Sequence, residues 1–286
     1  METSNGVEIA TLRGRVKRKD HPIVSVGDLV ELERHPEGGR VSGLLPRTSA
    51  LTRHGIARRR EQVIVANVDQ VAVVISAGSP EPDFLMVDRL LVLAELNEIP
   101  GVVVLNKIEL RAGPDPDPVE DPRLAPYRAA GYDILATSAK TGEGLDRFAD
   151  RLHGRITVLS GQSGVGKSSL LNALDPGLDL RVGAVGERKG RGRHTTVSAA
   201  LYPFPGGGHV ADTPGLQYLA LWNVAPVELA AAFPDLARLA GGCRFSDCRH
   251  REEPGCEVIA ARDGGKVDPR RYESYLGLLA EAEKGS

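Results

Sequence analysis

Apolar residues recur along the middle of the chain in short runs, and these runs alternate with longer segments of helical character. The strand-like runs cover residues 63–66, 70–76, 101–105, 132–136 and 156–160. The helical segments cover residues 83–96, 144–153 and 169–174. Strands that alternate with helices indicate a parallel sheet covered on both faces. We therefore expect an α/β domain across residues 63–221.

The two ends of the chain have different patterns. Residues 7–18, 22–34 and 40–45 are short segments with β-branched residues, and turn signals at 19–22 and 35–39 separate them. This spacing predicts a small antiparallel barrel within residues 1–62. Residues 222–286 are mostly helical, with segments at 225–232 and 235–239 and a final helix that starts at Asp268 and Pro269. Residues 113–122 are acidic and proline-rich, and we expect an irregular loop there.

Composition indicates the cellular compartment and one kind of binding partner. Residues 1–10 lack a basic start followed by an apolar run, and no stretch approaches the ~18 apolar residues of a membrane helix. We expect a cytoplasmic protein without membrane contact. The net charge is −2, yet residues 1–60 hold 12 Lys/Arg against 7 Asp/Glu. This local excess indicates either a polyanion-binding surface or a solvated face.

A phosphate-binding motif follows the strand-like run 156–160. The motif matches G-x-x-x-x-G-K-[ST] at every position, and a helical segment follows it. Its residues, with the first helical serine, are Gly161, Gln162, Ser163, Gly164, Val165, Gly166, Lys167, Ser168 and Ser169. Glycines let the backbone turn its N–H groups toward phosphate, and the helix adds its positive end. Lys167 supplies charge to the outer phosphates, and the Ser168 hydroxyl is a ligand for Mg²⁺.

Two further motifs indicate that the base is guanine. The first is Asn106-Lys107-Ile108-Glu109, directly after the run 101–105, and it resembles the N-K-x-D signature of GTPases. A carboxylate at Glu109 accepts hydrogen bonds from guanine, and adenine lacks that pair of donors. The carboxylate is one methylene longer than the usual aspartate. The second motif, Ser138-Ala139-Lys140, follows the run 132–136 and resembles the loop whose backbone N–H meets guanine O6.

Switch elements lie on the other side of the phosphate loop. Asp212 and Gly215 stand in a D-T-P-G sequence that resembles D-x-x-G, in which the aspartate holds Mg²⁺ through water and the glycine N–H reaches the γ-phosphate. A threonine between the two motifs would complete the Mg²⁺ site. Both Thr195 and Thr196 qualify, and we favour Thr196.

No convincing general base is present. Ras-like enzymes carry a glutamine just after D-x-x-G, whereas this chain has Leu216 there. His194 is either a catalytic participant or a solvated loop residue. We expect slow intrinsic hydrolysis and a partner that completes the site.

The order of these motifs is unusual. In ordinary GTPases the phosphate loop comes first, whereas here the two base motifs precede it. The motifs fit one site only if the domain is circularly permuted.

All three cysteines fall within a short segment. Cys243, Cys248, His250 and Cys256 form a set that suits tetrahedral Zn²⁺. Four protein ligands would fill the coordination sphere, so we expect a structural site. The alternative is three buried free thiols beside a chance histidine.

Together these residues resemble the bacterial GTPases that depend on the small ribosomal subunit. The motif order, the Cys/His spacing and the segments 26–30 and 45–53 carry the resemblance over nearly the whole chain. It implies an OB-fold RNA-binding domain at 1–62, a circularly permuted GTPase domain at 63–221 and a helical zinc-binding domain at 222–286. It also implies late maturation of the small subunit, stimulation of GTP hydrolysis by the ribosomal particle, and release with GDP.

The partners expected are therefore the small ribosomal subunit with its rRNA, and GTP or GDP. We expect a monomer because no coiled-coil pattern occurs. Two other functions stay open: a GTP-state-dependent RNA- or ribosome-binding module with negligible turnover, and a translation or signalling GTPase that acts off the ribosome.

Overall fold

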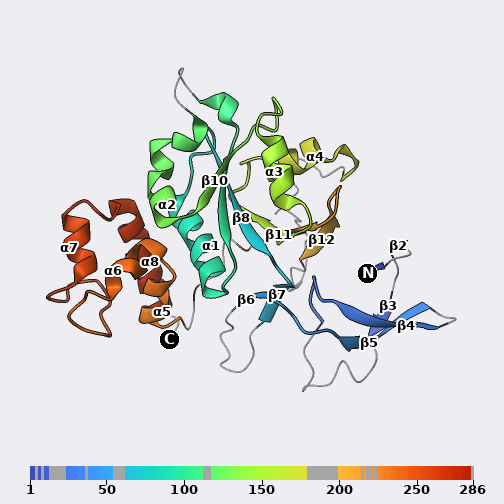
Figure 1. Cartoon of the computed structure of the whole chain (residues 1–286), viewed down its shortest axis with the longest axis horizontal. Coiled ribbons are helices and arrows are strands. Elements are labelled where there is room, and N and C mark those ends of the chain that lie inside the picture. Colours follow the sequence, from blue (N-terminus) through green and yellow to red (C-terminus); the bar gives the residue numbers. More distant parts are fainter. Residues whose placement is uncertain are drawn as a thin grey trace.

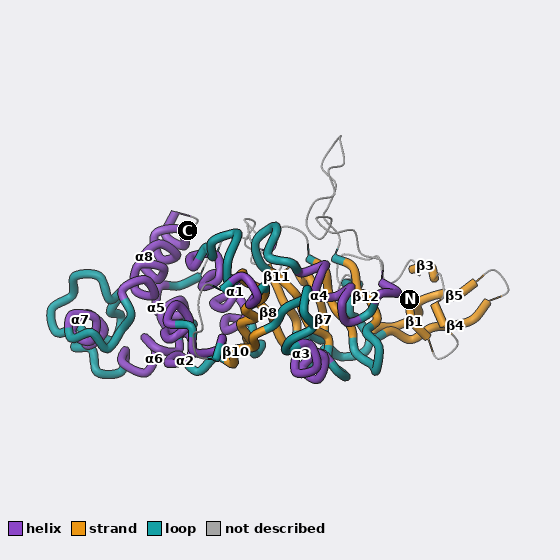
Figure 2. Tube along the Cα trace, turned by 90° about the horizontal axis from the view of Figure 1, so that it is seen from above, coloured by secondary structure: helices purple, strands orange, loops and turns teal. Residues whose placement is uncertain are grey.

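The computed structural model describes residues 1–3, 6–7, 10–12, 24–35, 38–53, 62–111, 117–178, 199–213, 216, 221 and 224–284. The molecule has three parts in a row: the N-terminal strands, a central sheet with its helices, and the C-terminal helices (Figure 1). Figure 2 shows the same row from above, with the C-terminal helices at one end and the N-terminal strands at the other. Within the described ranges, no helix has the length and apolar character required to span a bilayer.

The central sheet has six strands in the order β10-β9-β8-β11-β13-β12. They are β8 (Gln70–Ser76), β9 (Gly101–Asn106), β10 (Asp133–Ala136), β11 (Ile156–Ser160), β12 (Ala200–Pro203) and β13 (His209–Asp212). All neighbours are parallel except β12, which is antiparallel to β13 at one edge. The first four strands confirm the sequence prediction, while β12 and β13 were not predicted.

Helices cover both faces of this sheet. On one face lie α1 (Phe84–Leu96) and α2 (Ala125–Ala130), and on the other lie α3 (Leu145–Leu152) and α4 (Lys167–Leu174) (Figure 1). Alternate residues of β8 serve the two cores: Val73 belongs to the core that includes α1, and Val74 to the core that includes α3 and α4. Burial on both faces explains the nearly continuous apolar runs.

The N-terminal segment is built from strands. They are β1 (Glu2–Thr3), β2 (Gly6–Val7), β3 (Ala10–Leu12), β4 (Val30–His35), β5 (Gly38–Leu44), β6 (Ala50–Arg53) and β7 (Gln62–Ala66). β3, β5 and β4 form one sheet, β1 pairs with β2, and β6 pairs with β7. The predicted strand at 22–34 is shorter than expected, because residues 24–29 are irregular and Asp28 binds the side chain of Arg47. β7 spans the predicted boundary after residue 62, so that boundary stays a proposal.

The C-terminal segment is helical, as predicted. It contains α5 (Pro226–Ala231), α6 (Pro234–Ala240), α7 (Glu257–Asp263) and α8 (Pro269–Lys284). Of these, α7 was not predicted. Short 3-10 turns occupy η1 (Ile108–Leu110), η2 (Pro118–Glu120), η3 (Pro122–Leu124) and η4 (Pro176–Leu178). Part of the expected irregular loop at 113–122 is therefore a regular turn.

Candidate nucleotide site and metal centre

The predicted nucleotide motifs meet at one edge of the central sheet. Asn106 ends β9, Ser138 lies just after β10, Gly161 directly follows β11, and Asp212 ends β13. The carboxyl ends of parallel strands share one edge, which is where ligands bind in open α/β sheets. Four motifs that are separated in sequence are thereby brought together.

The glycines of the phosphate loop are required by its shape. Gly161 has φ +144°, and a Cβ atom there would lie 2.1 Å from the carbonyl oxygen of Val74. Gly166 has φ +97°, and its Cβ would lie 2.4 Å from Nδ2 of Asn106. The loop leads into the first turn of α4, while Ser163 and Gly164 are exposed. A tight backbone curve ahead of a helix N-terminus is suited to binding phosphate.

Lys167 is held beneath this loop. Its side chain is buried, with 8% exposure, and Nζ donates to the carbonyl oxygens of Gly161 (2.7 Å) and Gln162 (2.8 Å). Burial lowers the pKa of the Lys167 ammonium to about 8, and the charge of Asp212 acts in the opposite direction. An anion bound in the loop would favour the charged form further. Ser168, the next residue, is also buried.

Asn106 connects three of the motifs. Only 1% of it is exposed. Its Nδ2 donates to the carbonyl oxygen of Val165 in the phosphate loop, at 2.8 Å. Its Oδ1 accepts from the Thr137 hydroxyl (3.3 Å) and from the Ala139 N–H (3.4 Å). Asn106 therefore ties the phosphate loop to the loop after β10. The sequence indicated Asn106 as a base-binding residue but carried no signal of these contacts, because Val165 is 59 residues away.

The segment after Asn106 contains an unpaired buried acceptor. Lys107 has a left-handed backbone (φ +61°), and its Nζ donates to the carbonyl oxygen of Ser79 at 2.7 Å. Ile108 is buried. Oε2 of Glu109 is buried and has no hydrogen-bond partner within the described part of the chain. A buried carboxylate oxygen without a donor fits a base that presents N–H groups, as guanine does.

The loop after β10 is held by its own backbone. The Ser138 N–H donates to the Glu143 carbonyl oxygen at 2.9 Å, and Oγ of Ser138 accepts from the Thr141 N–H at 3.0 Å. Ser138 is buried, Ala139 is half-buried and Lys140 is exposed. This arrangement directs the Ala139 N–H to Oδ1 of Asn106, which belongs to the other base motif.

The switch residues are described only in part. Asp212 ends β13 and lies opposite Leu159 of β11. Strand β11 leads into the phosphate loop, so Asp212 lies on the strand next to it. Thr213 has a buried hydroxyl without a partner in the described residues, a feature that the sequence did not reveal. Leu216 is 3% exposed and packs in the core. The predicted residues His194, Thr195, Thr196 and Gly215 lie outside the described residues, so their roles stay predictions.

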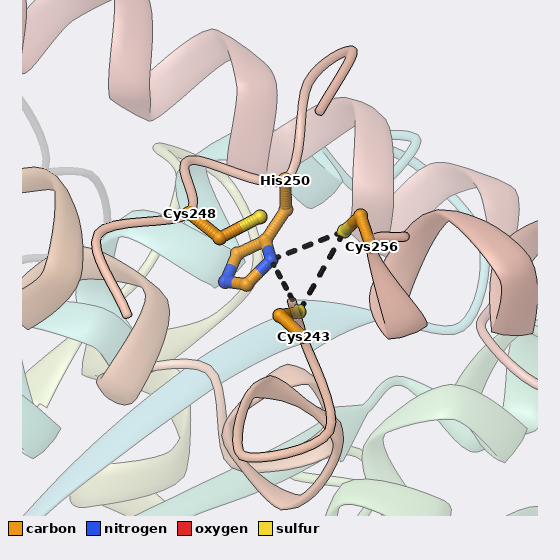
Figure 3. A group of neighbouring side chains, drawn as sticks. All are labelled: Cys243, Cys248, His250 and Cys256. Carbon is orange, nitrogen blue, oxygen red and sulfur yellow. Dashed lines mark hydrogen bonds between the residues drawn. The ribbon is translucent and has the colours of Figure 1, made fainter. Parts of the chain in front are cut away.

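Figure 3 shows the four predicted metal ligands gathered around one point. Their ligand atoms all lie within 4.8 Å of one another. Sγ of Cys243 lies 3.5 Å from Nδ1 of His250 and 3.8 Å from Sγ of Cys256, and Nδ1 of His250 lies 3.4 Å from Sγ of Cys256. In a tetrahedral site with Zn–S bonds of about 2.3 Å and Zn–N bonds of about 2.0–2.1 Å, neighbouring ligand atoms lie roughly 3.5–3.8 Å apart. Cys248 completes the group, and the set can hold a metal ion.

The surroundings support metal binding. Burial raises the pKa of the Cys248 thiol to about 12 and lowers the pKa of His250. Burial thus favours the neutral imidazole that metal binding requires, and the thiols must lose their protons when a cation binds. Helix α8 supports the ligand loop, because the Tyr272 hydroxyl donates to the carbonyl oxygen of His250 at 2.6 Å and the Tyr275 hydroxyl donates to that of Arg249 at 2.7 Å.

Comparison with known proteins decides the family. A sequence model of the RsgA GTPase family matches residues 44–222. This chain belongs to the RsgA GTPase family. A curated relative from Gemmatimonas aurantiaca, named small ribosomal subunit biogenesis GTPase RsgA, is 46% identical over 278 residues, which cover 95% of this chain and 89% of the relative. A relative of the same name from Moorella thermoacetica is 43% identical and covers 98% of this chain and 92% of its own.

Solved structures agree with this assignment. The crystal structure of YjeQ from Thermotoga maritima matches with a TM-score of 0.76 and 36% identity, covering 97% of this chain and 91% of that one. The structure of YloQ, described as a circularly permuted GTPase, matches with a TM-score of 0.74 and 31% identity, covering 100% of this chain and 90% of that one. The chain is therefore a GTP hydrolase with a permuted fold, and the fold class and enzyme class predicted from the sequence are confirmed.

Proposed function

We propose that this GTPase binds the small ribosomal subunit, assists its late maturation, and hydrolyses GTP with stimulation by the ribosomal particle. The names of its relatives support the target. The observation that carries the proposal is the Asn106 contact set, which joins the phosphate loop to both base motifs. Because one buried side chain contacts all three motifs, nucleotide binding can change the site as a whole, and a partner can respond to that change.

In this proposal the phosphate loop binds the triphosphate. The backbone N–H groups of residues 161–166 and the first turn of α4, including Ser169, cradle the phosphates. The Lys167 ammonium leaves its two carbonyl partners for phosphate oxygens and stabilises the charge that develops as water attacks the γ-phosphate. The Gly215 N–H contributes a donor to the γ-phosphate.

Residues of three segments would hold Mg²⁺. Ser168 supplies a hydroxyl, Asp212 binds through water, and Thr196, or alternatively Thr195, completes the set. When bound, Mg²⁺ neutralises negative charge on the β- and γ-phosphate oxygens. Ser168 is buried, Asp212 is half-buried, and the two lie on neighbouring elements at the same edge of the sheet, which supports this assignment.

The base motifs select guanine. Glu109 accepts from the base N–H groups through its unpaired oxygen, and the backbone of Ser138, Ala139 and Lys140 meets the base carbonyl. Lys107 and Ile108 flank the base. Adenine would leave the Glu109 carboxylate unpaired, which disfavours ATP.

The metal centre is proposed to hold one structural Zn²⁺. Three thiolates and one imidazole fill a tetrahedral sphere and leave no open position for chemistry. The segment between Cys243 and Cys256 contains one large apolar residue, Phe245, and it is exposed. A metal would therefore stabilise a loop that has little core of its own.

The N-terminal strands are proposed to contact rRNA. The excess of Lys and Arg over Asp and Glu in residues 1–60 favours phosphate contacts that weaken with salt. We further propose that the protein acts as a monomer, in the cytoplasm where subunits mature, with domains at 1–62, 63–221 and 222–286.

A second function has one observation in its favour. Leu216 stands where a water-orienting glutamine occurs in Ras-like enzymes, and its side chain is buried and apolar. A binding module that uses GTP as a state marker with negligible turnover would need nothing more at that position.

Sedimentation with ribosomal particles tests the proposed target. Wild-type protein and Lys167→Ala are mixed with purified small or large subunits, with a non-hydrolysable GTP analogue or with GDP. The proposal predicts co-sedimentation of wild type with small subunits in the analogue, less in GDP, and little of either with large subunits. Equal pelleting with both subunits, or no difference between the nucleotides, would overturn it.

A further inference from the structure

The loop between β8 and α1 is held by both nucleotide motifs. Oε1 of Gln162, in the phosphate loop, accepts from the Asp83 N–H at 3.1 Å. Nζ of Lys107, in the base motif, donates to the carbonyl oxygen of Ser79 at 2.7 Å. A Cβ atom at Gly164 would lie 3.8 Å from Cδ of Pro80. Both nucleotide motifs therefore contact residues 79–83 directly.

Helix α1 starts at the end of this loop. Asp83 is its N-cap, with Oδ1 accepting from the Met86 N–H at 3.1 Å. Most of the helix is buried, since eight of its 13 residues are buried: Met86, Val87, Asp88, Leu90, Leu91, Val92, Leu93 and Ala94. A tightly packed helix moves as one body rather than deforming locally.

The first turns of α1 also hold the C-terminal helices. Nη1 of Arg271, on α8, donates to Oδ1 of Asp88 at 2.6 Å, and both side chains are almost fully buried (2% and 1% exposed). Nη2 of Arg271 donates to Oδ1 of Asp235 on α6 at 2.6 Å. Arg89 forms a second ion pair with Glu281 of α8, at 2.5 Å. Figure 1 shows α1 between the sheet and α8.

We propose that α1 couples the nucleotide site to the metal-bearing C-terminal helices, with Gln162 and Glu281 as positioning residues at its two contacts. Bound nucleotide fixes the phosphate loop, Gln162 fixes the start of α1, and the Asp88 and Arg89 pairs fix α8. By linkage, a partner that displaces α8 changes nucleotide affinity by the same factor as nucleotide changes α8 docking. This regulation rests on the proposed function only in requiring that the site binds guanine nucleotide.

Amide hydrogen exchange of α8 in the full-length, metal-loaded protein tests the coupling. Exchange in residues 269–284 is measured with and without a saturating non-hydrolysable GTP analogue, and saturation is checked by a separate titration for each variant. Gln162→Met keeps the side-chain length and removes the acceptor for Asp83. Its matched control is Glu81→Gln, a side chain that is 81% exposed in the loop between β8 and α1.

The second variant breaks the other contact without disturbing the buried Arg271. Glu281→Gln removes the charge that pairs with Arg89, and Glu273→Gln changes an exposed glutamate on the same helix as its control. A coupling of ordinary size slows α8 exchange about fivefold or more on nucleotide binding. We expect this slowing in wild type and both controls, and its loss in Gln162→Met and Glu281→Gln.

Two results would overturn the coupling. One is a nucleotide response of α8 that persists unchanged in nucleotide-saturated Gln162→Met, which would show that Gln162 does not carry the signal. The other is a wild type that binds the analogue without any change in α8 exchange. Failure of the titration itself would instead count against the proposed nucleotide site, so the two failures are distinguishable.

Discussion

Replacing Asn106 with alanine tests whether one buried amide assembles the nucleotide site. The substitution removes the Nδ2 donor to the Val165 carbonyl oxygen, a 2.8 Å bond in a side chain that is 1% exposed. Leaving a buried carbonyl unpaired costs about 1–3 kcal/mol. The two contacts of Oδ1, at 3.3 and 3.4 Å, are long and add little. If the cost falls on the arrangement that binds nucleotide, affinity drops by about 5- to 150-fold.

The assay is titration of a fluorescent GDP analogue, with urea unfolding measured in parallel to separate affinity from stability. Thr141→Val is the control, because its exposed hydroxyl accepts a single 3.4 Å contact from the Glu143 N–H in the same loop. It should change affinity by less than about twofold. An Asn106→Ala protein that folds and binds GDP as tightly as wild type would refute the reasoning.

Three further predictions follow from the site geometry. Burial holds the pKa of Lys167 at about 8 and phosphate favours the charged ammonium, so GTP binding takes up a proton. GTP affinity should therefore fall as the pH rises through about 8 in titrations across this range, and Lys167→Met should abolish this pH dependence. Gly161→Ala places a Cβ 2.1 Å from the Val74 oxygen and should lower unfolding free energy by at least about 2 kcal/mol, whereas Gly142→Ala, with open space and φ +85°, should cost only about 1 kcal/mol in urea unfolding. Cys256→Ser, or a strong chelator, should release one zinc by elemental analysis and lower the thermal midpoint, while a midpoint indifferent to chelation would argue against a structural metal.

The parts of the site predicted from the sequence are those whose signal is local. The phosphate loop needs glycines and Lys167 at fixed spacing within one strand–loop–helix unit, and the structure has that unit. The four predicted metal ligands lie within fourteen residues of one another, and their side chains converge as expected. In both cases the residues that carry the chemistry are close together in the sequence.

Contacts that depend on distant partners could not be predicted. The Asn106 amide meets Val165, and Arg271 meets Asp88 183 residues earlier. Strand β13 was missed because its four residues become a strand only between β11 and β12. Helix α7 was missed for a related reason: its first cap is Cys256, whose Sγ accepts from the Ile259 N–H at 3.5 Å, a role that a metal-ligand pattern does not indicate.

We propose that the small ribosomal subunit activates GTP hydrolysis by this chain. The most direct test is the rate of GTP turnover by purified protein, measured with small subunits, with large subunits and without particles, in parallel with Lys167→Ala. We expect slow turnover of the isolated protein, marked stimulation by small subunits, none by large subunits, and loss of activity in the variant. Equal turnover with and without small subunits would contradict it.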